Sequence, residues 1–391
     1  MSKKLSFTPY LLISGSVLSN TVLFMSLAVL TLFLVETGFT NKQIGFSVGL
    51  MALAASTLAL VSWRIARPLG NRFAIFLGMA LCSFGYFALA NSSTFWSLIA
   101  SCFTIGFGKS IFEPILKASM SRYPLAGKPE LMFRMRYLSI CAGAFLGPLA
   151  AMAFAEKRAV IFSTSAILIC YAVMFFMVFP SDDESENDKS ENKNPEFLES
   201  HKFVRDRKLI ILTLAGGGVF LVFSLFEIIF PLVLNQNFKS ATPVFRTLLM
   251  TNALLGLILQ YPAIILSKKY STEVLAAWGC YLFGTSFIVF AMAKSSWPTW
   301  IFATFIFTCG EALALPASDI LIDKISSDKQ KAAYFGFGEL RQLGFFVGPF
   351  AGAFILDELG STILCVISTI IIALVSIFFL NVFPKKKEFL S

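Results

Sequence analysis

Charged residues are scarce in this chain. Aspartate, glutamate, lysine and arginine make up 14% of its 391 residues, whereas about a quarter of the residues in a soluble globular domain are charged. Hydrophobic residues account for 57% of the chain, and its mean hydropathy is +0.76. This shortage of charge excludes an ordinary soluble protein and predicts an all-α membrane protein.

Histidine and the common catalytic motifs are also nearly missing. The single histidine, His201, lies in a hydrophilic stretch, so proton handling inside apolar segments falls to carboxylates. The seven cysteines all fall in apolar runs without CxxC spacing, which argues against disulfides and zinc. The sequence contains no HExxH, no GxSxG and no phosphate-binding loop. We therefore expect no enzyme, no cofactor and no metal.

Long apolar runs, in contrast, are abundant. A helix of about 20 apolar residues crosses the hydrocarbon layer. The first run starts near Tyr10 and is followed by many more, so we interpret it as a retained span and not as a cleaved signal. We predict twelve spans, at 10–35, 43–65, 72–91, 95–120, 134–156, 158–179, 208–234, 243–268, 273–294, 297–323, 331–356 and 361–384.

One long polar segment divides these spans into two sets of six. It runs from Ser181 to Lys208, and its acidic first part is too poor in apolar residues to pack a core. We therefore predict an N-terminal six-helix bundle over 1–180, a cytoplasmic linker over 181–207 and a C-terminal six-helix bundle over 208–391.

The net charge of +9 is explained by topology better than by nucleic-acid binding. With the amino terminus inside, most basic connections face the cytoplasm, as the positive-inside rule requires. These cations are Lys3, Lys4, Arg64, Arg67, Arg72, Arg122, Lys128, Arg134, Lys268, Lys269, Lys324, Lys329, Lys331, Lys385, Lys386 and Lys387. Both termini are accordingly predicted to be cytoplasmic.

Two apolar spans contain related charged stretches. The fourth span reads GFGKSIFEP over residues 106–114, and the tenth reads GEALALP over residues 310–316. Superposing the two prolines places Lys109 on Glu311. A charge near the bilayer centre costs about 2.5–3.5 kcal/mol on insertion scales, so it is rarely kept without a partner or a water-filled cavity. This pattern predicts a polar site near the midplane between two repeats, which is typical of transporters.

The embedded charges suit proton coupling. Lys109, Glu113 and Lys117 follow i, i+4, i+8 spacing and form one stripe, with Lys117 expected to snorkel to the cytoplasmic face. Burial favours a neutral carboxyl and a nearby cation favours a charged one, so a changing glutamate–lysine separation binds and releases a proton. The candidate proton-coupling residues are Glu113, Glu311 and Glu227. Structural ion pairs between helices are the alternative interpretation.

A further motif occurs twice, one span after each charged stretch. The fifth span carries GAFLGP over 143–148, and the eleventh carries GFFVGP over 344–349. Small residues four apart let helices approach closely, and proline loosens the helix locally. The candidate gating residues are Gly147, Pro148, Gly348 and Pro349 in these motifs, together with Arg136, Glu339 and Arg341 near the cytoplasmic face.

Aromatic residues offer candidates for contact with cargo. The chain has 44 phenylalanines, most of which we expect to pack or to face lipid, while a minority line a greasy cavity. The candidate substrate-binding residues are Lys109, Asn20, Phe107, Phe226 and Phe230.

These features resemble the proton-driven drug antiporters of the major facilitator superfamily, in which GxxxGP of the fifth span is the antiporter signature. Residues 101–114 and 316–352 carry the resemblance, which implies two six-helix bundles. It also implies a monomer in the bacterial inner membrane whose partners are a small-molecule substrate, protons and lipid, without nucleic acid. The chain departs from the family at Arg67, where an aspartate is usual, and at Cys102 or Thr104, where many members have an arginine.

Three functions remain open from the sequence. The first is a proton-coupled exporter of drugs, a siderophore or another amphipathic metabolite. The second is a proton symporter that imports a peptide, siderophore or other nutrient. The third is a non-transporting receptor or a lipid flippase with the same fold.

Overall fold

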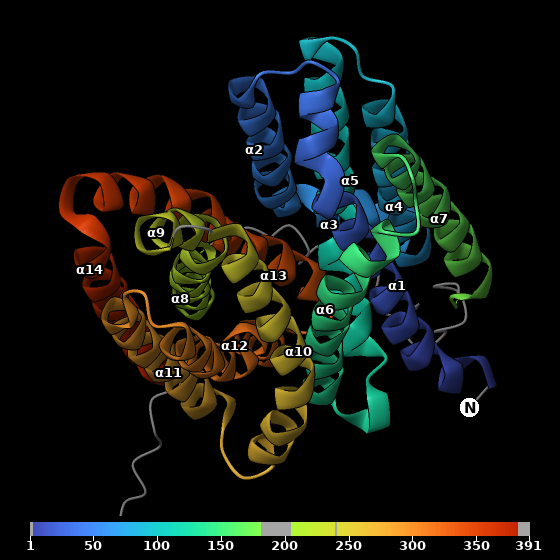
Figure 1. The fold of residues 1–391 in the computed structure, drawn as a ribbon. Coiled ribbons are helices and arrows are strands. Elements are labelled where there is room, and N and C mark those ends of the chain that lie inside the picture. Colours follow the sequence, from blue (N-terminus) through green and yellow to red (C-terminus); the bar gives the residue numbers. More distant parts are fainter. Residues whose placement is uncertain (1–2, 181–204, 239–240, 382–391) are drawn as a thin grey trace, which may run out of the picture. The chain divides into compact units, whose positions relative to one another are not determined.

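A computed structural model describes residues 3–180, 205–238 and 241–381, and every regular element in these ranges is a helix (Figure 1). The prediction of an all-α fold is therefore confirmed. His201 and most of the predicted linker lie outside the described residues.

Contacts between residues group the chain into two compact units. Unit 1 comprises Met1–Arg205 and Ser326–Gln342, and unit 2 comprises Asp206–Ile325 and Leu343–Ser391. The segment Ser326–Gln342 thus packs within unit 1, although it belongs by sequence to the second set of spans. The predicted division at residues 181–207 stays a prediction.

Unit 1 is built from the first six predicted spans and this inserted segment. Its elements are α1 (Lys3–Glu36), α2 (Asn41–Thr57), η1 (Leu58–Val61), α3 (Ser62–Leu69), α4 (Asn71–Ala90), α5 (Phe95–Arg122), η2 (Leu125–Gly127), α6 (Pro129–Ala151), α7 (Lys157–Val178), α13 (Lys331–Gly338) and η8 (Glu339–Gln342). Capping boxes start two of the helices, Thr40 with Gln43 at α2 and Thr94 with Ser97 at α5, because each pair satisfies backbone N–H groups that the first turn leaves free.

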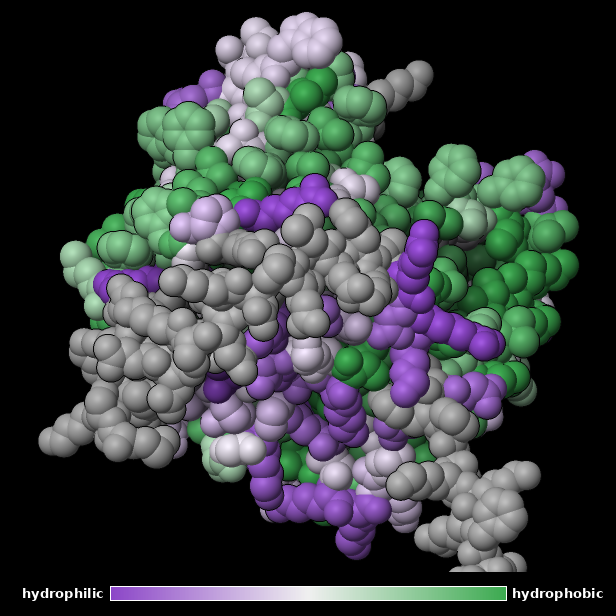
Figure 2. All heavy atoms as spheres, turned by 180° about the vertical axis from the view of Figure 1, so that it is seen from behind, coloured by the Kyte–Doolittle hydropathy of each residue, from purple (hydrophilic) through white to green (hydrophobic). Residues whose placement is uncertain are grey.

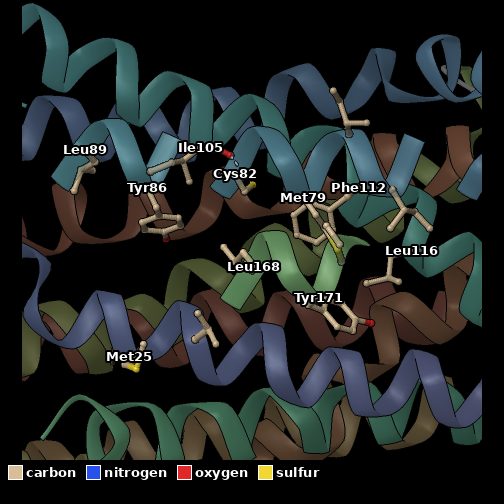
Figure 3. Packing of buried hydrophobic residues seen from close by; sticks show 14 of the residues in the cluster. Met25, Met79, Cys82, Tyr86, Leu89, Ile105, Phe112, Leu116, Leu168 and Tyr171 are labelled. Carbon is tan, nitrogen blue, oxygen red and sulfur yellow. Dashed lines mark hydrogen bonds between the residues drawn. The ribbon is translucent and has the colours of Figure 1, made fainter. Parts of the chain in front are cut away.

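The core of unit 1 lies where α4 packs between α5 and α7. Figure 3 shows Met79 and Tyr86 of α4 among Phe112 of α5 and Leu168 of α7, all of them buried. The thiol of Cys82 donates to the backbone carbonyl of Ile105 over 3.3 Å (Figure 3). This tight apolar packing fixes the position of α5, the helix that carries the charged stripe.

Unit 2 contains the later predicted spans, except for the part of the eleventh span that ends at Gln342. Its elements are α8 (Arg207–Ser224), η7 (Leu225–Ile229), α9 (Phe230–Asn237), α10 (Ala241–Ser267), α11 (Thr272–Ala293), α12 (Trp297–Ile325) and α14 (Leu343–Asn381). The element η7 is a π-helical turn between α8 and α9. Gly360, with φ of 85°, interrupts the long helix α14 and separates the last two predicted spans.

Ten helical stretches of the described residues are long and apolar enough to cross a membrane. One of them, Lys331–Asn381, holds two predicted spans, and α6, which carries three charged residues, is not among the ten. The count of twelve therefore stays a prediction. Figure 2 shows broad hydrophobic areas in the upper part and on the right of this face, while hydrophilic side chains gather near its centre and below. Among the described residues, exposed apolar side chains include Phe84, Met177 and Phe350. Such a surface suits contact with lipid.

A close glycine contact occurs in both units. In unit 1, a Cβ on Gly108 of α5 would lie 2.5 Å from the backbone oxygen of Gly78 in α4. In unit 2, a Cβ on Gly310 of α12 would lie 2.7 Å from the backbone oxygen of Gly279 in α11. The superposition that pairs Lys109 with Glu311 also pairs Gly108 with Gly310, so the structure supports the repeat at this position.

The two GxxxGP motifs also lie at helix crossings. A Cβ on Gly147 of α6 would lie 2.7 Å from Met25 N in α1. A Cβ on Gly348 of α14 would lie 2.5 Å from the backbone oxygen of Leu221 in α8. The prediction that these small residues allow close helix approach is confirmed in both units.

Candidate functional site

Unit 1 gathers its embedded charges into one set of side chains. We call this set the α5 charge cluster; it consists of Lys109, Glu113 and Lys117 of α5, Arg136 of α6, and Glu339 and Gln342 of η8. The sequence predicted proton coupling for Glu113, gating for Arg136 and Glu339, and contact with substrate for Lys109. Helix packing brings these residues together.

Glu113 is held by a cation from another helix. Arg136 donates through Nη2 to Glu113 Oε2 over 2.6 Å, and the two side chains are only 13% and 18% exposed. Lys109 and Lys117, one turn away on either side, also interact electrostatically with this carboxylate. Three cations therefore lie around this carboxylate.

The second pair of the cluster is more deeply buried. Lys117 donates to Glu339 Oε1, and Gln342 donates through Nε2 to the other carboxylate oxygen. The Lys117 and Glu339 side chains are each 2% exposed. The prediction that Lys117 snorkels is therefore wrong: Glu339 lies within reach, and a paired buried charge needs no path to water. The signal in the sequence was weak because Lys117 and Glu339 are 222 positions apart.

Lys109 differs from the other cations of the cluster. It is half-buried, and among the described residues it forms neither a hydrogen bond nor an ion pair, but has longer-range interactions with Glu113 and Cys82. Its neighbour Phe107 is also half-buried and stacks on Phe103 with ring centroids 6.3 Å apart. Asn20 donates to Ser16 O over 2.7 Å within α1, and none of its hydrogen bonds in the described part of the chain reaches the cluster.

Unit 2 holds a different polar group around Glu311 of α12. Asn252 of α10 donates through Nδ2 to Glu311 Oε2 over 2.6 Å and to Thr308 Oγ1 over 3.0 Å. Glu311 is 6% exposed. Sequence reasoning missed Asn252, although an amide in the middle of the apolar eighth span was the signal that could have identified it.

Glu227 lies in the π-helical turn η7 and interacts electrostatically with Glu311. Pro231 has no N–H, so it cannot bond the carbonyl of Glu227 one turn earlier. π-Helical turns are rare and occur frequently at functional sites. The structure thus brings together two of the three predicted proton-coupling residues, while Glu113 lies in unit 1.

The two phenylalanines predicted to touch cargo in unit 2 are core residues here. Phe226 and Phe230 have no exposed surface. Phe226 stacks on Phe307 at 4.4 Å, and Phe230 meets Phe290 at 4.6 Å and Trp300 at 5.7 Å between ring centroids. These rings support the turn that carries Glu227.

The remaining gating candidates occupy varied positions. Arg341 of η8 is buried. Pro148 is exposed and Pro349 half-buried, each next to a glycine at a helix crossing. Their roles stay predictions.

Comparison with known proteins identifies the family to which the chain belongs. The family model of the Major Facilitator Superfamily matches residues 11–228 and again residues 212–390. An uncharacterized MFS-type transporter, YqjV of Bacillus subtilis strain 168, is 24% identical over 90% of this chain and 86% of its own length. Multidrug resistance protein MdtH of Photorhabdus laumondii is 22% identical over 91% of this chain and 88% of its own. The predicted resemblance to this family and its multidrug resistance proteins is confirmed.

Solved structures show the same fold. The human organic anion transporter MFSD10 (TETRAN) superposes with a TM-score of 0.79 at 15% identity, over 97% of this chain and 100% of the other. A variant of the Escherichia coli fucose:proton symporter FucP superposes with a TM-score of 0.76 at 14% identity, over 96% of this chain and 98% of the other.

Proposed function

Because the chain belongs to the Major Facilitator Superfamily, a family of transporters and not of enzymes, we propose that it is a proton-coupled exporter of small amphipathic molecules. It is a multi-pass membrane protein, as expected from its apolar helices. In this proposal it works as a monomer in a bacterial inner membrane with both termini in the cytoplasm, and cargo leaves as protons enter by alternating access.

The observation that carries the proposal is the setting of Glu311. Its side chain is almost fully buried, accepts a hydrogen bond from the amide of Asn252 and interacts electrostatically with a second carboxylate, Glu227. A neutral amide favours the charged form of an acid less strongly than an arginine does. We therefore assign the proton to Glu311, with Glu227 as its partner.

Glu113 fits a supporting role in this mechanism. Its ion pair with Arg136 joins α5 to α6 and keeps the two helices in register. Lys109, which forms no ion pair with the described residues, is the cation available to an anionic group of the cargo. Phe107 and Asn20 remain the proposed neighbours of cargo. Phe226 and Phe230 are buried and act by packing around the turn η7.

The proposed gate is the buried set Lys117, Glu339 and Gln342, with Arg341 beside it on η8. Opening of this gate requires the Lys117–Glu339 ion pair to separate and the Glu339 carboxylate to become hydrated. Gly147 with Pro148, and Gly348 with Pro349, are the proposed points where α6 and α14 bend.

Export is favoured by the relatives named multidrug resistance proteins. The second candidate is proton-coupled import, which the fucose:proton symporter of the same fold favours. A receptor or flippase role predicts cargo binding without flux.

The test uses purified protein in liposomes with an imposed pH gradient. Cargo is first found by thermal-shift screening of cationic dyes, siderophores and peptides. We expect acid on the side opposite to the cargo to drive exchange, and Glu311→Gln to abolish this coupling. Glu36→Gln is the matched control, because Glu36 is exposed.

Undiminished proton-driven exchange by Glu311→Gln would reject the assignment of the carrier. Movement of cargo in the same direction as protons would favour import. Binding with no flux under either gradient would support the receptor.

A further inference from the structure

The side chain of Asn252 connects two residues on one face of α12. Its Nδ2 donates to Thr308 over 3.0 Å and to Glu311 over 2.6 Å. The Thr308 hydroxyl in turn donates to the backbone carbonyl of Thr304 over 2.8 Å. Thr308 and Glu311 are three residues apart in a helix, so they lie on the same face, against which α10 packs.

The Thr304 carbonyl determines the direction of this chain of hydrogen bonds. A carbonyl oxygen can only accept, so the Thr308 hydroxyl donates its single hydrogen to it. The Thr308 oxygen is then an acceptor, and Asn252 has to present its NH2 group rather than its carbonyl to α12. The second N–H of the same group reaches Glu311. A fixed donor therefore faces the carboxylate.

We propose that Asn252 is a positioning residue that holds Glu311 as a hydrogen-bond acceptor and thereby sets the pH at which Glu311 exchanges its proton. The inference rests on the function proposed above, since it concerns the same carboxylate. A hydrogen bond to an ionised carboxylate is about twice as strong as one between neutral groups. The oriented amide therefore favours release of the proton, and its loss favours retention.

The charged groups of unit 2 on the helices around Glu311 are as follows. Glu227 of η7 is the carboxylate that interacts with it. The remaining charged residues of α8, α10 and α11 lie near the ends of those helices, and those of α12 lie two or more turns farther along. These charged residues are Arg207, Lys208, Arg246, Glu273, Asp319, Asp323 and Lys324. The helix α11 also carries a buried thiol, that of Cys280.

The test follows protonation of Glu311 without a known cargo. Dicyclohexylcarbodiimide reacts with protonated carboxyl groups in apolar surroundings, and mass spectrometry of the full-length purified protein reports modification of Glu311 across pH. We expect Asn252→Leu to move the midpoint of this curve to higher pH by about one unit. Thr308→Val frees the amide to turn and should move the midpoint in the same direction by less.

Thr304→Val is the matched control. Its hydroxyl donates only along its own helix, to Trp300 O over 2.9 Å, and the variant keeps the backbone carbonyl that orients the network. We expect its midpoint to equal that of the wild type.

Equal midpoints for the wild type, Asn252→Leu and Thr308→Val would overturn the inference, as would a shift in Thr304→Val as large as that in Asn252→Leu. Thr308→Val keeps the test decisive if Asn252→Leu does not fold. Failure of the proposed function shows separately, as proton-driven exchange that persists in Glu311→Gln.

Discussion

At the scale of single residues, the same side chain has different chemistry in the two units. Glu113 is paired with a guanidinium, Glu339 with a buried ammonium and an amide, and Glu311 with a neutral amide. The cost of a buried charge depends on its partner and not on its depth alone. From the sequence, Glu113 and Glu311 were expected inside their spans and Glu339 near the cytoplasmic face. The structure adds a partner for each of them.

The Lys117–Glu339 pair gives a prediction at this scale. Lys117→Met leaves a buried carboxylate without its cation, which should lower the free energy of unfolding by about 3–5 kcal/mol. The double variant Lys117→Glu/Glu339→Lys should recover most of this loss, because it restores the pair in reverse. Thermal unfolding of the purified protein measures both effects.

The pair Lys157–Glu36 is the control, since its side chains are 34% and 58% exposed. Lys157→Met should cost no more than about 1 kcal/mol. Equal melting temperatures for Lys117→Met and Lys157→Met would contradict the structural importance of the buried pair.

At the scale of helices, glycine decides which elements meet. Gly78 with Gly108 joins α4 to α5, and Gly279 with Gly310 joins α11 to α12. These contacts place Lys109 and Glu311, each one residue after a contact glycine, at matching levels of the two repeats. The close approach of the paired helix backbones therefore helps to set the positions of Lys109 and Glu311.

Gly310→Ala tests this arrangement. The added Cβ would lie 2.7 Å from the Gly279 backbone oxygen, and backbone cannot move aside as a flexible side chain can. We expect a lower melting temperature and a loss of about 1–3 kcal/mol, typical of overpacking.

The matched variant is Gly45→Ala in α2, where nothing lies within 4 Å of the new Cβ. Alanine has the higher helix propensity, so this change should stabilise the protein by up to about 1 kcal/mol. An unchanged melting temperature for Gly310→Ala would show that the packing of α11 against α12 does not need the close approach.

At the scale of the whole molecule, duplication and topology are the main features. The family model matches twice along the chain, once over each half. The distribution of cations predicts that both termini are cytoplasmic.

Single introduced cysteines test this topology. Ser93 precedes α5 and Lys128 precedes α6, and both are exposed. We expect a membrane-impermeant maleimide to label Ser93→Cys on intact cells, and Lys128→Cys only after the cells are opened. The unmodified chain gives the background from its own cysteines. The reverse labelling pattern would show that the orientation is inverted.

The sequence by itself determined the helical membrane class, the family resemblance, the repeated motifs and which charges lie inside apolar spans. These properties follow from hydrophobicity, spacing and composition, which are local and therefore readable along the chain. The prediction of close helix approach at the GxxxGP motifs held for the same reason, since small residues act at their own positions.

Only the tertiary structure decided the partners. Arg136 meets Glu113 across 23 positions, Asn252 meets Glu311 across 59, and Lys117 meets Glu339 across 222. Which helix faces meet depends on packing between distant segments of the chain. For this reason the sequence could identify the glutamates but not the partners that each of them meets.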